Sequence, residues 1–247
     1  MSSARSDAET DRQALVAKWN LEYEQGGIPS SARSSPSGAV NWAVNVMQRH
    51  NLPMRTALDI GCGKGRNSLF LARQGVEVTA IDFVPDAIRA LEESAKKEGL
   101  SGKIRPILYD VTEPWPIQAA SMDLVIDAFC FKHITPFPAR EHYKRELLRV
   151  LRARGRYLIS FASVGDGYYG QYVVEKRQID GEEEHLVIDP GNGIESILFT
   201  RKHALNFFEP ELCLHLELHD AKPSEMHGDS YPRDTYALLL QRYSSPI

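Results

Sequence analysis

The middle of the chain alternates short apolar runs with stretches in which apolar residues recur every three or four positions. The short runs occupy residues 56–60, 76–81, 104–109, 122–128 and 156–162. The helically spaced stretches occupy residues 67–73, 85–97 and 139–152. The runs predict buried strands, and the stretches between them predict helices. Strands that alternate with helices in this way predict an α/β fold, a parallel sheet with helices on both faces.

The N-terminal part follows a different pattern. Leu15, Val16 and Trp19 predict a helix, which a segment rich in Gly, Ser and Pro separates from a second helix over residues 39–50.

The alternation also stops after residue 162. Residues 165–193 are polar and aromatic and contain turn signals, which predicts an irregular or hairpin insertion. Thr200 is placed to cap a short helix through Phe208. Residues 212–218 and 235–243 predict two closing strands that pair as a hairpin with a long loop.

Composition excludes several classes of protein. The 247 residues are 25% charged with a formal net charge of -4. This net charge gives no general electrostatic attraction for nucleic acid or for an anionic membrane. No apolar run approaches the roughly 20 residues of a membrane span, and the N-terminus lacks an apolar signal segment. Cys62, Cys130 and Cys213 lie far apart and match no zinc spacing. We therefore expect a reduced, cytoplasmic setting and no metal.

The segment from Ala57 to Asn67 is the main candidate for chemistry. It joins an apolar run to a helical stretch through Gly61, Gly63 and Gly65. A glycine turn at the carboxyl end of a strand is where open α/β sheets bind nucleotides. A dinucleotide fingerprint needs its third glycine where Arg66 stands, so binding of NAD is disfavoured.

Acidic residues follow the neighbouring strands. Asp82 ends the second strand, where a carboxylate can accept both hydroxyls of a ribose. Asp110 follows the third strand and precedes Val111, so that it could accept from an adenine amino group while the valine covers the ring. Each acid alone could be a solvated strand end. Together with Asp59 beside the glycine turn, they favour a nucleoside site.

These segments resemble the successive motifs of class I S-adenosylmethionine-dependent methyltransferases. The motifs are residues 58–67, 78–82, 108–111 and 122–128. The resemblance implies a Rossmann-like, doubly wound sheet of seven strands, mostly parallel with the last strand antiparallel, and S-adenosyl-L-methionine as the cofactor. It implies one methyltransferase domain over residues 1–247, divided into a helical lid (1–51), a cofactor-binding core (52–163), a substrate-side insertion (164–210) and closing strands (211–247). The cofactor residues that it implies are Asp59, Gly61, Cys62, Gly63, Arg66, Asn67, Asp82, Phe83, Asp110, Val111, Asp127, Ala128 and Phe129.

A narrower resemblance concerns the acceptor. Residues 61–72 and 78–80 are similar to tellurite-resistance and thiopurine-type methyltransferases, which methylate small, soft sulfur, selenium or tellurium nucleophiles. In the tellurite-resistance group a His and an Arg before the last strand approach the acceptor, and His227 and Arg233 hold similar places here. The residues between them, 229–232, do not match closely.

Other side chains could form the acceptor pocket. His133, after the fourth strand, could act as a base or orient the acceptor, or it could cap the next helix. Trp19 and Tyr23 share one helical face and could close over the cofactor, or they could be a hydrophobic staple. The tyrosines of the insertion could form a pocket wall or a solvent-facing loop. They are Tyr168, Tyr169 and Tyr172.

The sequence favours an enzyme that acts on a small molecule. The motif for methylation of nucleic-acid amines is absent, because residues 127–130 read Asp-Ala-Phe-Cys. The expected partner is therefore a small methyl acceptor and not a nucleic acid or a membrane, with the protein a monomer or homodimer. N- or O-methylation of a secondary metabolite is a second possibility. A noncatalytic module that binds S-adenosylmethionine is a third, although the long insertion argues against it.

Overall fold

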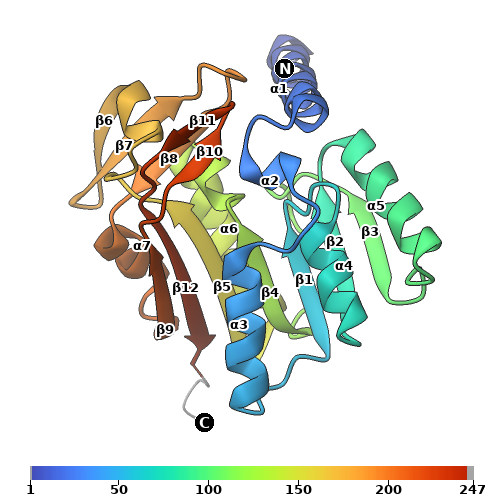
Figure 1. Cartoon of the computed structure of the whole chain (residues 1–247). Helices are drawn as coiled ribbons and strands as arrows, with labels where there is room; N and C mark the ends of the chain where they lie inside the picture. The colour runs from blue at the N-terminus through green and yellow to red at the C-terminus, as the bar shows by residue number, and fades with distance from the viewer. Residues whose placement is uncertain (1, 244–247) are drawn as a thin grey trace.

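The computed structural model describes residues 2–243, with side chains from residue 10 onward. Its centre is a seven-stranded sheet in the order β3-β2-β1-β4-β5-β12-β9, in which β12 runs antiparallel to both of its neighbours (Figure 1). Its strands are β1 (Thr56–Ile60), β2 (Glu77–Asp82), β3 (Ile104–Leu108), β4 (Met122–Ala128), β5 (Leu151–Ala162), β9 (Leu212–Asp220) and β12 (Thr235–Arg242). The doubly wound sheet with an antiparallel last strand is confirmed.

Helices cover both faces of this sheet. The helices are α1 (Ser2–Gln25), α2 (Pro29–Ala32), α3 (Gly38–Arg49), α4 (Arg66–Arg73), α5 (Pro85–Lys97), α6 (Phe137–Val150) and α7 (Arg201–Phe208). One buried cluster packs α3, α4 and α5 against the sheet through residues such as Val40, Leu71 and Leu91. A second cluster packs α6 and α7 on the opposite face. The central strands are therefore buried on both faces, which explains their continuous apolar runs.

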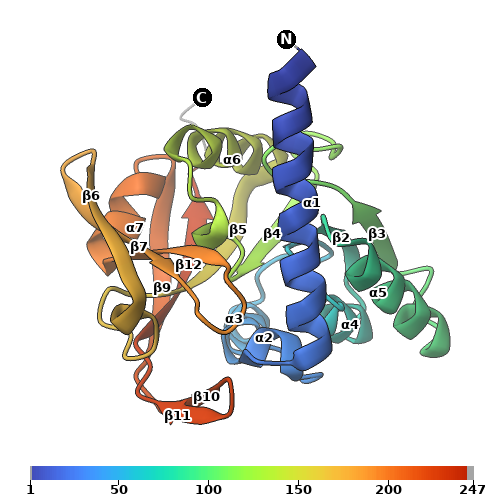
Figure 2. The ribbon, with the colours of Figure 1, turned by 90° about the horizontal axis from the view of Figure 1, so that it is seen from above.

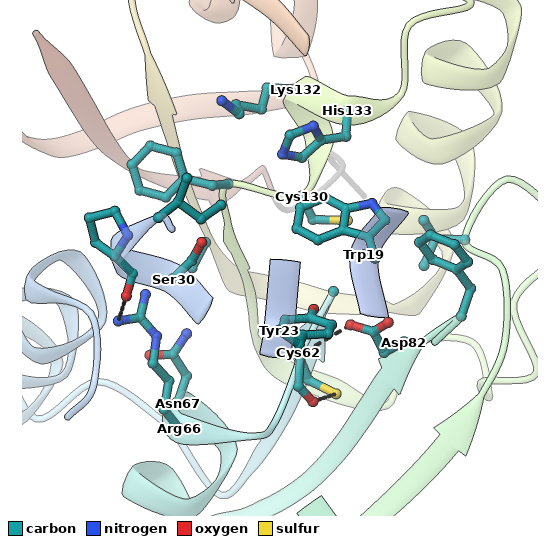
Figure 3. A pocket seen from close by; sticks show the side chains of 18 of the residues that line it. Trp19, Tyr23, Ser30, Cys62, Arg66, Asn67, Asp82, Cys130, Lys132 and His133 are labelled. Atoms are coloured by element: carbon teal, nitrogen blue, oxygen red, sulfur yellow. Dashed lines mark hydrogen bonds between the residues drawn. The ribbon is translucent and has the colours of Figure 1, made fainter. Parts of the chain in front are cut away.

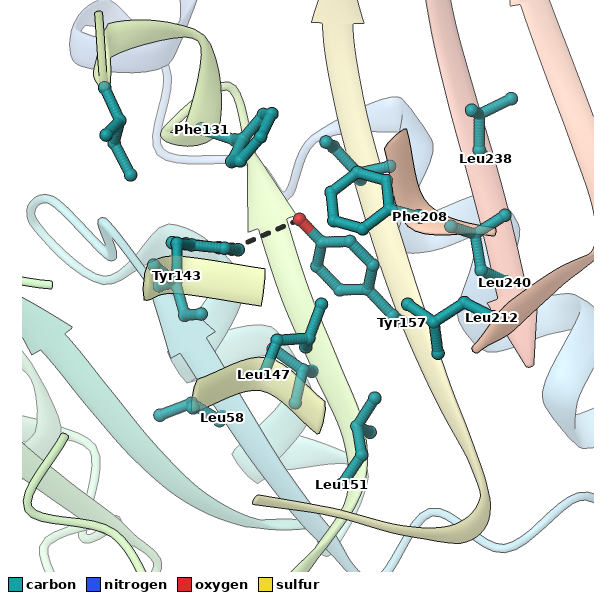
Figure 4. Close-up of a cluster of buried hydrophobic side chains, with 14 of the residues drawn as sticks. Leu58, Phe131, Tyr143, Leu147, Leu151, Tyr157, Phe208, Leu212, Leu238 and Leu240 are labelled. Carbon is teal, nitrogen blue, oxygen red and sulfur yellow. Dashed lines mark hydrogen bonds between the residues drawn. The ribbon is translucent and has the colours of Figure 1, made fainter. Parts of the chain in front are cut away.

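The second cluster is rich in aromatic side chains (Figure 4). Tyr143 from α6 and Tyr157 from β5 are fully buried, and their hydroxyl oxygens lie 3.2 Å apart. The Tyr143 hydroxyl donates to the Asp127 carboxylate at 2.7 Å. Because a buried hydroxyl without a partner is costly, this pairing fixes α6 against the carboxyl end of β4.

The insertion forms regular structure of its own. After the 3₁₀ turn η2 (Tyr169–Tyr172) it builds an antiparallel sheet from β6 (Val173–Ile179), β7 (Glu182–Ile188) and β8 (Glu195–Phe199). Fully buried Arg140 and Glu184 form an ion pair at 2.6 Å between α6 and β7. The hairpin alternative predicted for residues 165–193 is confirmed as β6–β7. Beyond that range, β8 adds a third strand, whose Phe199 bridges to Ser163 after β5.

The termini of several elements also differ from the prediction. The first helix begins at Ser2, and a short hairpin of β10 (Ser224–Met226) and β11 (Asp229–Tyr231) fills the loop between the closing strands. The Thr200 side chain accepts from the backbone N–H of His203, which confirms that it caps α7. Seen from above, α1 lies across one end of the sheet, between the insertion and α5 (Figure 2).

We expect Leu147→Ala to lower the free energy of unfolding by about 2–5 kcal/mol, because Leu147 is fully buried between α6 and the sheet. Urea unfolding measures the change. Leu216→Ala on the outer strand β9 is the control, with an expected change within about 0.5 kcal/mol, because Leu216 is exposed. Equal midpoints for the two variants would contradict the packing of α6.

Candidate cofactor and acceptor site

A cavity opens at the carboxyl edge of the parallel strands. In the sheet register Ile60 lies opposite both Ile81 and Asp127, so β1, β2 and β4 end side by side. The cavity has about 1070 Å³ of space, including space open to solvent. Its walls come from the strand ends, α1, η1 (Phe131–His133) and the hairpin β10–β11 (Figure 3).

The glycine turn after β1 needs glycine for two separate reasons. Gly61 has a φ of 62°, and a Cβ on it would lie 2.7 Å from the Cβ of Cys130. Gly65 has a φ of 84°, and a Cβ on it would lie 2.2 Å from Cδ1 of Leu91 on α5. Only glycine adopts this backbone without strain and without these clashes. The turn therefore presents bare backbone to the cavity while α5 packs closely behind it.

Asp82 connects this turn to the end of β2. Its carboxylate accepts from the backbone N–H groups of Gly63, at 2.8 Å, and of Val84, at 2.9 Å. Burial raises its pKa to about 6, and these N–H donors and the Tyr23 hydroxyl act in the opposite direction. Asp82 is the only acidic residue among the described residues that line the cavity. It is thus a desolvated acceptor, suited to ribose hydroxyls.

Three other predicted cofactor residues lie outside the cavity wall. Asp59 is buried behind the turn, where it accepts from the Ser68 hydroxyl at 2.5 Å. Asp127 accepts from the backbone N–H groups of Cys130 and Phe131 and so shapes the loop after β4. Asp110 accepts from Thr112, and its neighbours Tyr109 and Val111 line the cavity instead.

Burial also changes the ionisation of these groups. It raises the pKa of Asp59 to about 7 and that of Asp127 to about 6. Burial raises the pKa of the Cys62 and Cys130 thiols as well. Both cysteines therefore remain thiols at neutral pH, and neither is a thiolate nucleophile.

The end of α1 closes the cavity from above. Trp19 and Tyr23 both line it, with their ring centroids 5.8 Å apart. Between them in sequence, Glu22 is fully buried and accepts from the backbone N–H of Ile28 and from the side chain of Asn192, each at 2.9 Å. These bonds fix α1 to the segment that follows it and to the insertion. The aromatic pair is therefore held over the strand ends.

His133 lines the cavity under Trp19, whose ring it meets edge-on at 5.0 Å. Its Nδ1 lies 2.8 Å from the carbonyl oxygen of Glu195. A carbonyl only accepts, so Nδ1 carries the proton and Nε2 keeps its lone pair. Burial, together with Lys132, lowers the pKa of His133 to about 3. The imidazole is therefore neutral and is a hydrogen-bond acceptor at Nε2.

Arg233 and His227 lie in different surroundings. Arg233 lines the cavity, donates from Nε to Asp166 at 2.7 Å and lies over the Tyr169 ring. His227 is not among the cavity-lining residues. A Cβ on Gly27 or on Gly191 would lie 2.3 Å from its ring, so the imidazole is packed between these two segments. In this place the ring ties hairpin β10–β11 to the N-terminal segment.

Most of the other predicted residues do meet at the cavity. Those that line it are Gly61, Cys62, Gly63, Arg66, Asn67, Asp82, Phe83, Val111, Ala128, Phe129, Trp19, Tyr23 and Tyr169. Tyr168 and Tyr172 pack against neighbouring rings outside the cavity wall. Lys132 and Met226 are among the cavity-lining residues that the sequence did not single out. Lys132 stands next to His133 in a short 3₁₀ turn, so the loop after β4 was the available signal.

The residues present fit an adenosyl cofactor. Gly61 and Gly63 line the cavity without side chains, and the Tyr23 hydroxyl lies against Gly63. Asp82 supplies a charged acceptor, and Val111 and Phe83 give apolar walls. Among the described residues, no group of three or more His, Cys, Asp or Glu side chains could hold a metal ion. No helix in the described part of the chain is long and apolar enough to cross a membrane.

Comparisons with known proteins agree with this geometry. Residues 57–155 match the family model described as "Methyltransferase domain". Human EEF1A lysine methyltransferase 2 is 33% identical over 132 residues, which cover 49% of this chain and 54% of that protein. The Haemophilus influenzae protein named "Probable S-adenosyl-L-methionine-dependent methyltransferase TehB" is 46% identical over 54 residues, 22% of this chain and 18% of that protein. The chain thus spans about half the length of the first relative and less of the second.

Among solved structures, a Burkholderia thailandensis 1,6-didemethyltoxoflavin-N1-methyltransferase has a TM-score of 0.69 at 19% identity, covering 96% of this chain and 90% of that one. Its crystal contains 1,6-didemethyltoxoflavin and S-adenosylhomocysteine. At this identity the likeness concerns the fold. The matched segment, residues 57–155, runs from β1 into β5 and resembles a methyltransferase domain.

Because Asp59 is buried, we expect the stability difference between the wild type and Asp59→Asn to depend on pH. Its pKa rises on folding from an ordinary value of 3.8 to about 7, so the folded state holds this proton more tightly and loses that advantage as the pH rises from 4 to 7. Asp59→Asn keeps an acceptor for Ser68 and removes the ionisation. The free energy of unfolding of the variant, relative to that of the wild type, should therefore increase by up to about 4 kcal/mol between pH 4 and pH 8.

Chemical denaturation of both proteins at several pH values measures this difference. Asp180→Asn is the control, because Asp180 is exposed in a hairpin turn at a φ of 50° that asparagine also adopts. A wild-type to Asp59→Asn difference that stays constant across this range would show that Asp59 ionises normally in the fold.

Proposed function

We propose that this protein is an enzyme that transfers a methyl group from S-adenosyl-L-methionine to a small-molecule acceptor. The main support for this proposal is the distribution of side chains along the cavity. A desolvated carboxylate, Asp82, stands beside a bare glycine turn at one end, and polar side chains not needed for an adenosyl group stand at the other. A module that only bound the cofactor would not need this second end, which we call the acceptor end, formed by Lys132, His133, Tyr169, Met226 and Arg233.

When bound, S-adenosyl-L-methionine supplies a methyl group on a sulfonium centre that is reactive towards nucleophiles. The chain contributes positioning and a dry environment. Asp82 and the backbone of the glycine turn bind the cofactor, while Trp19 and Tyr23 cover the cavity and exclude water. Aromatic rings at this position also favour a nearby cation through their π faces.

His133 can orient the acceptor. Its neutral ring offers Nε2 as an acceptor of a hydrogen bond from an N–H, O–H or S–H group. A ring with a pKa of about 3 is a weak base at neutral pH, so the acceptor must be nucleophilic already or must ionise easily.

Two observations support a small acceptor. The cavity is covered by α1 and bordered by hairpin β10–β11, so an acceptor has to fit between them. The structural relative that covers 96% of this chain carries a small heterocycle in its own crystal. The lysine side chain of a protein is the second candidate, favoured by the 33% identity to a protein lysine methyltransferase.

A methyl-transfer screen with labelled cofactor tests the proposal. Thiols, phenols, heterocyclic amines, selenite and tellurite form the small-molecule arm, and lysine-containing peptides form the protein arm. Transfer to at least one small acceptor supports the proposal. Transfer to the peptides alone would replace it by the second candidate, and cofactor binding without transfer in either arm would favour a noncatalytic module.

Asp82→Ala should weaken binding of S-adenosylhomocysteine by more than about tenfold, because buried ribose hydroxyls lose a charged acceptor. Isothermal calorimetry measures the affinity. Asp86→Ala, at an exposed position near the start of α5, should leave it unchanged. Unchanged affinity in Asp82→Ala would remove Asp82 from the cofactor site.

His133→Ala should lower kcat about tenfold by removing one hydrogen bond to the acceptor, with cofactor affinity unchanged. In the wild type, His133 should contribute no step to the pH profile near the ordinary histidine pKa, because it stays neutral there. Steady-state kinetics across pH 5 to 9 test both points. A step near pH 6.5 that disappears in His133→Ala would show that the ring titrates and acts as a base.

A further inference from the structure

The Lys132 side chain is buried at the acceptor end of the cavity. It is 2% exposed, and its Nζ has no hydrogen-bond partner among the described residues. It nevertheless lines the cavity, across from the glycine turn (Figure 3). Leaving a buried polar group unpaired is costly, and the cost is larger for a charged one. A lysine in this place needs an explanation.

The nearby carboxylates are already engaged. Asp166 accepts from Arg233 at 2.7 Å and from the backbone N–H of Tyr169 at 3.0 Å. Asp189 accepts from the Tyr168 hydroxyl at 2.6 Å and from the backbone N–H of Gly191 at 2.9 Å. Arg233 is therefore compensated by a carboxylate, whereas Lys132 has none within hydrogen-bond distance.

Aromatic rings take the place of a counter-charge. Nζ of Lys132 lies 3.6 Å from the centroid of the Tyr169 ring and 6.0 Å from that of Phe129. A cation over a ring face is stabilised by the ring's π electrons, and this stabilisation only partly offsets the cost of burial. Burial, with Arg233 adding to it, accordingly lowers the pKa of Lys132 to about 7.

The charge of the cavity is distributed unequally. Among the described residues that line it, Asp82 is the one acid and stands at the cofactor end, while Lys132 and Arg233 both stand at the acceptor end beside Tyr169. An acceptor with an ammonium group would meet like charges there. An acceptor with an anionic oxygen would supply the partner that Lys132 lacks, through a charge-assisted hydrogen bond.

We propose that Lys132 is the specificity-determining residue of the acceptor end and binds the carboxylate or phenolate oxygen of an aromatic acceptor. The inference rests on the proposed function, because that function defines the acceptor end. Tyr169 and Trp19 supply aromatic walls for the ring of such a molecule. Protein lysine side chains in their charged form are excluded by the same charges.

Two probes test this on the full chain saturated with S-adenosylhomocysteine. The first is the affinity for benzoate against that for its neutral analogue benzamide, measured by calorimetry. The wild type should prefer benzoate by at least about tenfold, and Lys132→Met should bind the two about equally. The second is 4-nitrophenol, whose phenolate form is coloured. The absorbance of the phenolate should increase on binding to the wild type and should not increase on binding to Lys132→Met.

Matched variants separate specificity from structure. Lys132→Arg should keep a preference for benzoate, and Lys103→Met, at an exposed lysine, should behave as the wild type. Lys132→Met should melt at the same or a higher temperature than the wild type, because it removes an unpaired buried amine. Loss of benzoate and benzamide binding together, with a lower melting temperature, would show a structural role and overturn the proposal.

The remaining outcomes are also decisive. A wild-type complex that binds no aromatic anion, or that binds benzoate and benzamide equally, overturns the inference and leaves the methyltransferase proposal intact if methyl transfer is observed. Retained benzoate preference in Lys132→Met overturns it as well. Failure of the wild type to bind S-adenosylhomocysteine contradicts the proposed function, and the inference with it.

Discussion

Buried carboxylates at the carboxyl edge of the sheet hold the site together. When β1, β2 and β4 end side by side, the loops that follow leave backbone N–H groups without strand partners. Asp82 accepts from the turn after β1, and Asp127 accepts from the turn after β4. Both carboxylates are buried, which raises their pKa values, and the N–H groups that they bind act in the opposite direction and favour the ionised form. Loop shape and carboxylate charge therefore depend on each other.

This constraint explains why some acids face the cavity and others do not. Asp82 accepts from Gly63 and Val84 and lines the cavity, whereas Asp127 accepts from Cys130, Phe131 and Tyr143 behind the cavity wall. Asp127 acts on the site indirectly. It fixes the loop that carries Lys132 and His133 to the acceptor end.

The cavity has different chemistry at its two ends. The cofactor end combines bare backbone with one carboxylate, which suits a nucleoside. The acceptor end combines aromatic rings, a neutral imidazole and an uncompensated amine. Because α1 is fixed over both ends by the buried Glu22, the two ligands would share one water-poor space. Low polarity there strengthens each remaining electrostatic contact.

The sequence alone determined the sheet, the glycine turn and Asp82, because these depend on local pattern: apolar runs, backbone that only glycine adopts, and an acid at a strand end. It did not determine which residues of the insertion and the last hairpin reach the cavity. Tyr169 lines it while Tyr168 does not, and Arg233 lines it while His227 is packed between Gly27 and Gly191. Nor did it show Lys132, whose importance comes from burial and from the engagement of Asp166 and Asp189 elsewhere. Those facts depend on contacts between segments far apart in the chain, which only the tertiary structure decides.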